Sequence, residues 1–371
     1  MDIYGSYMAR CIELAGHGRG NVAPNPMVGA VIVHDGHIIG EGYHRCYGEA
    51  HAEVNAIVSV RDESLLQSST LYVSLEPCSH YGKTPPCAEL IIKKKIPRVV
   101  VACTDPFPEV AGRGLKMLRE AGVEVVTGVM EQEAIEMNRF FMTAHKKQRP
   151  YIILKWAQSA DGFIDHTRND ASEKPAQLST PVTRMIVHKL RSEVQAIMVG
   201  TNTAVMDNPS LTVRHWTGKS PVRALIDRNL RVPEDNNLFD GSNQTVIFTT
   251  RHISGSIQQK LQDKNIEYVK MDESVLFFKN ILANLYKKNI HSLLVEGGAC
   301  IHRCFVNENF WDEIIIETSP VFLKNGVKPL DIDTIHDAQI VDTYSIPGFL
   351  ASEIKPSVIK RYKMASLKKI K

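Results

Sequence analysis

Short apolar runs alternate with helical patterns along the first 130 residues. Runs that are bounded by glycine, proline or polar residues, as β-strands are, occur at 27–33, 38–43, 70–76, 98–103 and 123–127. Between them, apolar positions recur at helical spacing at 51–60, 87–95 and near 112–121. This alternation predicts an α/β layer sandwich.

The second half repeats the α/β pattern without an internal sequence repeat. Strands are expected at 151–156, 194–199, 222–227, 244–249, 292–296 and 313–317, and helices near 180–192, 256–263 and 275–288. The polar segment 146–150 ends in proline and separates the halves. We therefore expect two domains, 1–147 and 148–371, and find no motif beyond about residue 330.

Composition fits this division and narrows the possible partners. A chain of 371 residues exceeds the usual size of one hydrophobic core. The net charge is only +3, and no basic stripe interleaved with aromatic residues predicts nucleic-acid binding. No apolar run of membrane-spanning length and no secretory signal is apparent, so we expect a cytoplasmic protein without membrane partners. Seven cysteines, an odd count, argue against a disulfide framework.

Three residues of the first half form a candidate metal site. His51 opens a predicted helix, Cys78 follows a predicted strand, and Cys87 opens the next helix. One imidazole and two thiolates leave the fourth position of tetrahedral zinc for water, as in catalytic zinc sites. Zinc lowers the pKa of such a water toward about 7. Glu53, two residues after His51, is suited to carry its proton.

Two other interpretations stay open at this point. A structural zinc site would need a fourth protein ligand, for which Cys103 and His80 are the nearby candidates. It would leave the position of Glu53 unexplained. A deaminase of nucleosides or nucleic acids would need an aromatic-lined basic groove, which the sequence does not show.

The spacing of the two cysteines carries a family resemblance. Eight residues separate them in Glu76-Pro77-Cys78-Ser79-His80-Tyr81-Gly82-Lys83-Thr84-Pro85-Pro86-Cys87, which resembles the motif of riboflavin-pathway pyrimidine deaminases. The resemblance extends to 23–26, 28–29, 51–53 and 112–114 and implies a fold similar to cytidine deaminases. It also implies that the substrate contacts are Asn25, His80, Lys83 and Asp105. Phe107 departs from the family, which usually has asparagine there, so an amide contact to the pyrimidine is lost.

The second half carries several small motifs in a fixed order. Lys155-Trp156-Ala157-Gln158 ends its first strand, 199–203 and 207–214 follow later strands, and 294–299 is a strand that runs into a glycine turn. Glycines after a strand would let backbone N–H groups at a helix N-terminus hold a pyrophosphate.

In this order the motifs resemble the riboflavin-pathway reductase domain, from about 149 to 330. That resemblance implies a dihydrofolate-reductase-like α/β fold that binds NADPH, with cofactor contacts at Ala157, Thr203, Asp207, Gly298, Ala299, Cys300, Ile301, His302, Arg303 and Cys304. It implies substrate contacts at Ser179, Arg191, Leu211, Arg214 and Glu296. Arg191 could instead be a helix C-terminal charge that interacts with the helix dipole. Residues 175–179 depart from the Ser-x-Trp-Ile-Thr pattern common in the family.

Together the halves predict a bifunctional riboflavin biosynthesis enzyme with one Zn²⁺ per chain and NADPH. The first domain would hydrolytically deaminate 2,5-diamino-6-(5-phosphoribosylamino)pyrimidin-4(3H)-one. The second would reduce the ribosyl group of 5-amino-6-(5-phosphoribosylamino)uracil to ribityl. Lys155 and Glu296 are the expected groups for steering protonation, and the sequence leaves open which one donates. The resemblance also implies a homo-oligomer with small-molecule substrates.

Overall fold

The chain divides into two compact units, Met1–Arg149 and Pro150–Lys371, in a computed structural model. The division falls within the polar segment 146–150. The structure describes residues 3–79, 81, 85–107, 111–255, 259, 263–273, 277–335, 337–346 and 356–365. His80 and Lys83 therefore lie outside the described residues, as does most of the helix predicted at 256–263.

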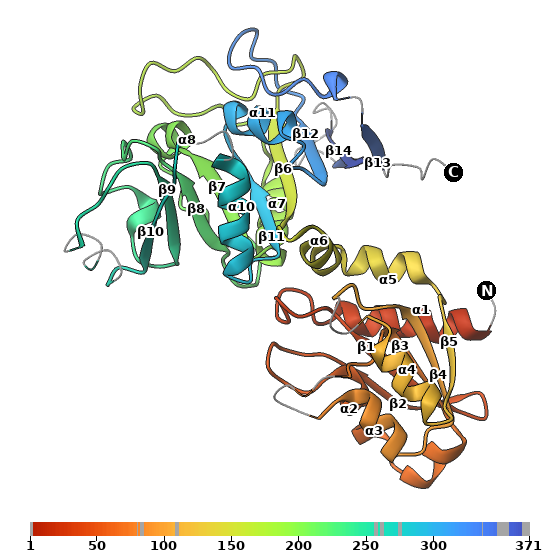
Figure 1. The fold of residues 1–371 in the computed structure, drawn as a ribbon. Coiled ribbons are helices and arrows are strands. Elements are labelled where there is room, and N and C mark those ends of the chain that lie inside the picture. The colour runs from red at the N-terminus through yellow and green to blue at the C-terminus, as the bar shows by residue number, and fades with distance from the viewer. Residues whose placement is uncertain are drawn as a thin grey trace. The chain divides into compact units, whose positions relative to one another are not determined.

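A five-stranded sheet forms the centre of the first unit (Figure 1). Its order is β2 (His37–Tyr43), β1 (Gly29–His34), β3 (Thr70–Leu75), β4 (Arg98–Cys103) and β5 (Glu124–Thr127). β1 runs antiparallel to β2 and β3, whereas β3, β4 and β5 are parallel. The carboxyl ends of β3 and β4 therefore meet at one edge of the sheet.

Helices cover both faces of this sheet. The helices are α1 (Ile3–Gly16), α2 (Ala52–Ser59), α3 (Cys87–Lys93), α4 (Arg113–Glu120), α5 (Glu131–Met137) and α6 (Arg139–Lys147), with a 3-10 turn at Glu63–Ser68. Because side chains alternate along a strand, Ala30 and Ile32 join the core under α2, α3 and α4, while Val31 and Val33 join the core under α1, α5 and α6. The predicted α/β/α sandwich is confirmed.

A nine-stranded sheet organises the second unit. Its order is β10 (Ile266–Lys270), β9 (Thr245–Thr249), β8 (Val222–Ile226), β7 (Ala196–Gly200), β11 (Ser292–Val295), β6 (Tyr151–Gln158), β12 (Glu313–Thr318), β14 (Ser357–Met364) and β13 (Ala338–Ile346). The strands from β10 to β12 are all parallel. β14 and β13 add an antiparallel hairpin to the edge.

The helices of this unit follow strand ends. They are α7 (Pro181–Glu193), α8 (Thr201–Asp207), α10 (Phe277–Lys287) and α11 (Ala299–Asn307), with 3-10 turns at Asn237–Phe239 and Ile332–Thr334. α10 and α11 bury Ile281, Leu285 and Phe305 in the core on one sheet face (Figure 1). α8 follows β7 and α11 follows β11, so both helix N-termini lie at the carboxyl edge of the sheet.

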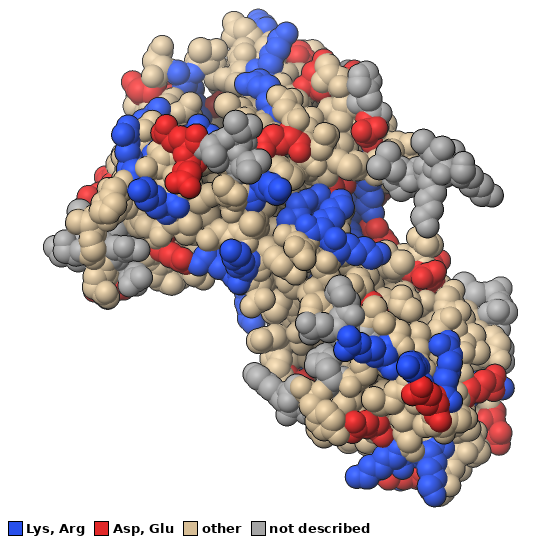
Figure 2. Space-filling view, in the orientation of Figure 1, with Lys and Arg blue, Asp and Glu red and all other residues tan. Residues whose placement is uncertain are grey.

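The structure adds to the sequence interpretation in two places. The polar segment 146–150, in which the domain boundary was predicted, begins inside α6, which continues to Lys147. Beyond residue 330, where no motif was found, β13 and β14 complete the sheet. Among the described residues, no helix has both the length and the apolar character needed to cross a lipid bilayer. On the face drawn in Figure 2, each unit carries basic and acidic side chains interspersed with one another.

Two candidate active sites

The first site gathers the three predicted zinc ligands. The His51 Nδ1 atom lies 3.6 Å from the Cys78 Sγ atom and 3.4 Å from the Cys87 Sγ atom. Tetrahedral zinc, with bonds of about 2.3 Å to sulfur and about 2.0 Å to nitrogen, separates neighbouring ligand atoms by roughly 3.5 to 3.8 Å. The observed spacing therefore fits a zinc ion without rearrangement. Within the described residues the cluster has three members, and Cys103 is not among them.

Local packing places these ligands. Cys78 follows β3, while His51 caps the start of α2 and Cys87 is the first residue of α3. α2 lies close against β2 because Gly42 has no side chain: a Cβ atom there would stand 2.3 Å from the Ala56 nitrogen. The backbone N–H of Cys87 donates a hydrogen bond to the Cys78 sulfur at 3.2 Å.

The electrostatics of the cluster favour one thiolate, on Cys78. The hydrogen bond from Cys87 holds the pKa of Cys78 far below its ordinary value, to about 4, and His51 acts in the same direction. The pKa of Cys87 is raised in turn, because that thiol donates to Cys78 and is buried. One negative charge is thus shared by two sulfurs. A divalent cation would allow both to be thiolates.

Glu53 lies in the first turn of α2 and is only 3% exposed. Burial raises the pKa of Glu53 to about 7, and the neighbouring Cys78 charge adds to this effect. A carboxyl group with this pKa can both accept and return a proton near neutral pH.

A cavity of about 450 Å³ adjoins the cluster. Asn25, Asp105 and Phe107 line it together with His51 and Glu53. The Asn25 amide donates to the His44 Nε2 atom at 3.2 Å, and the other ring nitrogen of His44 faces the Ala50 carbonyl at 3.1 Å. These contacts fix the rotamer of Asn25.

Aromatic rings form the wall where the family usually has an amide. The ring centroid of Phe107 lies 5.2 Å from that of His145, which in turn lies 4.4 Å from that of Phe141. Phe141 and His145 come from α6 and were not predicted from the sequence. The signal in the sequence was that two aromatic residues lie four positions apart on one helix.

One buried carboxylate organises the loop that carries Asp105. Glu76, at the end of β3, accepts hydrogen bonds from the backbone N–H groups of Asp105, Gly112, Gly114 and Leu115, at distances of 3.0 to 3.4 Å. Gly114 is required there because a Cβ atom would stand 2.0 Å from the Pro77 oxygen. The loop after β4 and the start of α4 are thereby held beside the metal cluster.

A larger cavity, of about 1040 Å³, lies in the second unit at the carboxyl edge of its sheet. Most of the predicted reductase residues line it, namely Lys155, Ala157, Ser179, Arg191, Thr203, Asp207, Glu296, Gly298, Ala299, Cys300, Ile301, His302, Arg303 and Cys304. Leu211 and Arg214 are not among its lining residues. The cavity runs along the starts of α8 and α11.

Arg191 and Glu296 form a bidentate ion pair inside this cavity. The Arg191 Nε and Nη2 atoms donate to the two Glu296 oxygens at 2.9 and 2.6 Å, and Nη1 donates to the Thr212 carbonyl at 3.0 Å. Burial acts to raise the pKa of Glu296, but Arg191 outweighs it and holds that pKa below its ordinary value. Arg191 is therefore not merely a helix C-terminal charge.

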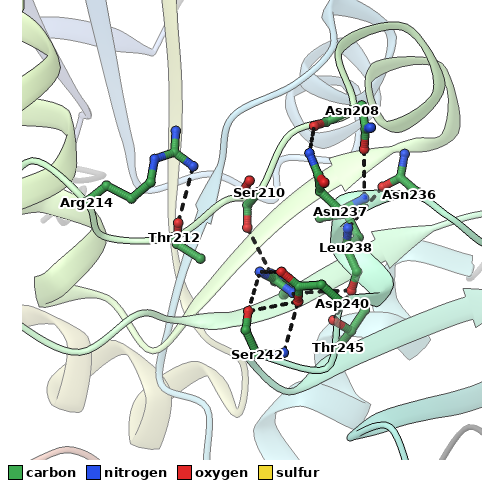
Figure 3. A network of polar contacts seen from close by, with 11 residues as sticks. Asn208, Ser210, Thr212, Arg214, Asn236, Asn237, Leu238, Asp240, Ser242 and Thr245 are labelled. Atoms are coloured by element: carbon green, nitrogen blue, oxygen red, sulfur yellow. Dashed lines mark hydrogen bonds and ion pairs between the residues drawn. The ribbon is translucent and has the colours of Figure 1, made fainter.

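The loop with Leu211 and Arg214 is held by a polar network (Figure 3). Leu211 is buried with a positive φ of 52°, and the exposed Arg214 side chain donates to the Thr212 hydroxyl at 3.3 Å. Beneath the loop, the fully buried Arg223 donates to the Ser210 carbonyl at 2.9 Å and to Asp240 at 2.7 Å.

Further contacts fix both ends of this loop. Asn237 donates two hydrogen bonds of 2.7 Å to Asn208, one from its backbone N–H to the side-chain oxygen and one from its side-chain amide to the backbone carbonyl (Figure 3). Near Arg214, the ring nitrogen Nδ1 of His188 accepts the backbone N–H of Arg214 at 2.9 Å. Burial, helped by the charge of Arg191, lowers the pKa of His188 to about 4, so it accepts as a neutral ring.

The segment 165–179, which ends in the stretch that departs from the family pattern, contributes contacts of its own. Arg168 forms ion pairs with Asp165 and with the predicted cofactor residue Asp207. Ser179 donates its hydroxyl hydrogen to Glu317 at 2.8 Å, and Glu317 also lies 3.7 Å from the Lys155 ammonium. Sequence reasoning missed Arg168 and Glu317, although a glutamate near the end of an apolar strand was a visible signal.

Backbone shape at the larger cavity suits a pyrophosphate. Gly200 and Gly297 precede the starts of α8 and α11, and Cβ atoms at these positions would approach Ile301 Cδ1 to 2.5 Å and Thr203 Oγ1 to 3.0 Å. The first N–H groups of a helix have no intrahelical partner and attract anions. The helix starts that border the cavity thus fit an anionic group such as the pyrophosphate of a nicotinamide cofactor.

Comparison with known proteins agrees with both sites. Residues 1–103 match the cytidine and deoxycytidylate deaminase zinc-binding region, and residues 150–332 match the RibD C-terminal domain. The riboflavin biosynthesis protein RibD of Bacillus amyloliquefaciens is 42% identical over 325 residues, which cover 87% of this chain and 86% of that protein. RibD of Aquifex aeolicus is 40% identical over 332 residues, 89% of this chain and 91% of that protein.

A solved structure gives the same result. The diaminohydroxyphosphoribosylaminopyrimidine deaminase/5-amino-6-(5-phosphoribosylamino)uracil reductase of Thermotoga maritima is 34% identical, with a TM-score of 0.84 over 98% of this chain and 99% of that one. Acinetobacter baumannii RibD is 30% identical, with a TM-score of 0.84 over the same shares. The chain therefore belongs to the RibD family of riboflavin biosynthesis proteins, which join a zinc-binding deaminase domain to a reductase domain.

Proposed function

We propose that the first unit deaminates 2,5-diamino-6-(5-phosphoribosylamino)pyrimidin-4(3H)-one and that the second reduces the ribosyl group of 5-amino-6-(5-phosphoribosylamino)uracil with NADPH. The observation that carries the first assignment is the three-ligand cluster beside the buried carboxyl group of Glu53. The substrate names printed for the Thermotoga maritima relative support the specific reactions. Residues 1–147 and 148–371 would be the two functional domains.

In the deaminase, His51, Cys78 and Cys87 would hold one zinc ion, which supplies Lewis-acid activation of water when it is bound. Glu53 would take a proton from the attacking water and deliver it to the ring nitrogen, and later to the departing ammonia. Asn25 and Asp105 line the same cavity and would orient the pyrimidine. We keep His80 and Lys83 as proposed contacts, with Lys83 suited to the phosphate.

In the reductase, the carboxyl edge of the sheet would bind both NADPH and the ribosyl phosphate. Ala157, Thr203, Asp207 and the run 298–304 would contact the cofactor, which supplies hydride when it is bound. Ser179, Arg191, Leu211, Arg214 and Glu296 would contact the substrate. Because Arg191 keeps Glu296 ionised, Lys155 is the proposed proton donor as hydride reaches the sugar.

Substitution of Glu53 tests the deaminase assignment. Glu53→Gln should lower the rate of ammonia release from the diaminopyrimidine substrate by roughly 100- to 10,000-fold, because the proton carrier is lost. The zinc content measured by atomic absorption should stay at one ion per chain, because Glu53 is not a ligand. Unchanged ammonia release would contradict the catalytic role of Glu53 and favour a structural zinc site.

Stepwise incubation tests the bifunctional assignment. Ammonia should be released from the diaminopyrimidine substrate in the absence of NADPH. NADPH that is added afterwards should be oxidised, which is measured as a fall in its absorbance. Ammonia without NADPH oxidation would limit the function to the first unit. Oxidation of NADPH only with pre-deaminated substrate would point to a defect at Phe107 or at the metal cluster. The absence of both signals would overturn the proposal.

A further inference from the structure

Glu317 occupies an unusual place beside the reductase cavity. It lies on β12, which pairs with β6, the strand that carries Lys155. Its side chain is 1% exposed, so a charge is held almost entirely out of water. Removing a carboxylate from water is costly unless charged or hydrogen-bonding partners compensate.

The compensation that Glu317 receives is incomplete. Its Oε2 atom accepts the Ser179 hydroxyl at 2.8 Å and lies 3.7 Å from the Lys155 ammonium. Its Oε1 atom is buried and has no hydrogen-bond partner among the described residues. Leaving a buried acceptor without a partner costs stability. Stability alone therefore does not account for a carboxylate here, and a role in the site does.

The charges around Lys155 show what that role is. The charges of Arg191 and Glu296 compensate each other in their bidentate ion pair. The nearby His188 and His302 are neutral rings, because burial lowers the pKa of each to about 4. The charge of Lys155 also acts on Glu296 and helps to lower its pKa, but among the described residues the carboxylate that forms an ion pair with the Lys155 ammonium, at 3.7 Å, is Glu317.

We infer that Glu317 is a positioning residue of the reductase, which holds the Lys155 ammonium and the Ser179 hydroxyl in place for the sugar. The inference rests on the proposed reductase site. At 3.7 Å the lysine is attracted to the carboxylate without a tight hydrogen bond. Its three N–H donors remain able to reach a ligand in the cavity that Lys155 and Ser179 both line.

The same contact links the altered loop to the sheet. Ser179 is the last residue of the stretch 175–179 and precedes α7, whose Arg191 pairs with Glu296. Glu317 thus connects two segments on which the ribosyl phosphate would rest. Loss of its charge should disturb turnover more than it disturbs binding of the cofactor, because the residues that Glu317 contacts are Lys155 and Ser179, which are not among the proposed cofactor contacts.

The test is Glu317→Gln in the full chain, which removes the charge and preserves the shape. Glu313→Gln is the matched control, because Glu313 lies on the same strand, is also 1% exposed, and pairs with Arg361 and Tyr151 instead. For each protein, kcat and KM for deaminated substrate and for NADPH are measured between pH 6 and 9. The melting temperature of the second unit reports whether each variant is folded, and ammonia release by the first unit serves to normalise the amount of intact protein.

For Glu317→Gln we expect kcat to fall at least tenfold, the KM for NADPH to stay within twofold, and the alkaline limb of the pH profile to move to lower pH. Ser179→Ala should also lower kcat, but by a smaller factor. Glu313→Gln should change the melting temperature but keep the reductase pH profile of the wild type.

A wild-type pH profile and kcat in Glu317→Gln would overturn the inference. So would equal losses of kcat in both variants, since these would indicate a general effect on folding. If Glu317→Gln is too unstable to assay, Ser179→Ala decides, and a wild-type kcat in that variant would count against the inference. Failure of the wild-type protein to oxidise NADPH would instead refute the proposed reductase itself.

Discussion

Arg191 shows how one contact decides the chemistry of another side chain. Sequence reasoning left Lys155 and Glu296 as equal candidates for steering protonation. The bidentate pair with Arg191 keeps Glu296 ionised, so Glu296 is an acceptor and Lys155 is the remaining donor. No spacing in the sequence reveals this, because Arg191 and Glu296 are 105 residues apart.

His302 makes a pH-dependent contribution to the stability of the second unit. It is 2% exposed, contacts the Val295 carbonyl at 3.0 Å, and has a pKa that burial lowers to about 4. Between that value and the ordinary pKa near 6.5, the unfolded chain binds a proton that the folded chain does not. The contribution is therefore fully present above about pH 6.5 and is lost as the pH falls toward 4.

His302→Gln tests this contribution. The substitution should destabilise the second unit at pH 7, because packing is lost, and the deficit should shrink at pH 5, because the variant has no imidazole to protonate. Urea unfolding of the full chain at both pH values measures the difference. Equal deficits at the two pH values would show that His302 is not held neutral in the folded state.

At the scale of elements, Glu76 joins β3 to the loop that follows β4. Glu76→Gln should destabilise the first unit by about 2 to 3 kcal/mol, because an amide accepts more weakly than a carboxylate and turns N–H groups toward the N–H groups of Gly112 and Gly114. Thermal unfolding of the full chain measures this. Glu63→Gln, which alters an exposed ion pair with Lys94, should cost far less. Equal losses would show that the Glu76 network is dispensable.

The spacing between β2 and α2 should control metal affinity. Gly42→Ala would place a methyl group against the backbone of α2 and displace the helix that begins after His51 and carries Glu53. We expect the zinc affinity to fall roughly tenfold, as when supporting residues of metal sites are changed. Gly16→Ala is the control, because a Cβ atom at Gly16 would meet no neighbouring atom within 4 Å. A competition titration with a chromophoric chelator would show whether only the first variant is weakened.

The sequence predicted elements whose patterns are local. β4 lies where its apolar run was predicted, and α7 differs by one residue at each end, because Thr180 and Pro181 mark its start. The hairpin of β13 and β14 was missed because β13 is mostly exposed and its pairing partner lies beyond residues 347–355. The hairpin joins the sheet because β14 pairs with β12, and this long-range contact leaves no local pattern in the sequence.

For the sites, the sequence predicted residues that share short motifs. The zinc ligands and Glu53 come from two such motifs, and the structure brings them together. Leu211 and Arg214 were predicted with the reductase site, yet they lie outside the cavity lining, on a loop supported by Arg223. Glu317, Phe141 and His145 were not predicted, because their proximity to the sites arises only from folding.

At the scale of the whole molecule, all three metal ligands belong to the first unit. Removal of zinc from the full chain with a chelator should abolish ammonia release and leave NADPH oxidation with pre-deaminated substrate unchanged. A heating curve should show a lower melting temperature for the first unit, because ligand binding stabilises only the unit that binds. Restoration of ammonia release by added Zn²⁺ is the control. A parallel loss of the reductase signal would show that the two activities depend on one another.

Each unit has its own sheet and its own hydrophobic cores among the described residues. A core substitution in one unit should therefore leave the other enzyme intact, and selection can act on the two activities separately. In a genome that encodes another pyrimidine deaminase, the first half of this gene would be free to accumulate changes while the second half stayed constrained. The fold thus allows one half of a fused gene to decay, or to be replaced by recombination near codon 149, without loss of the other half.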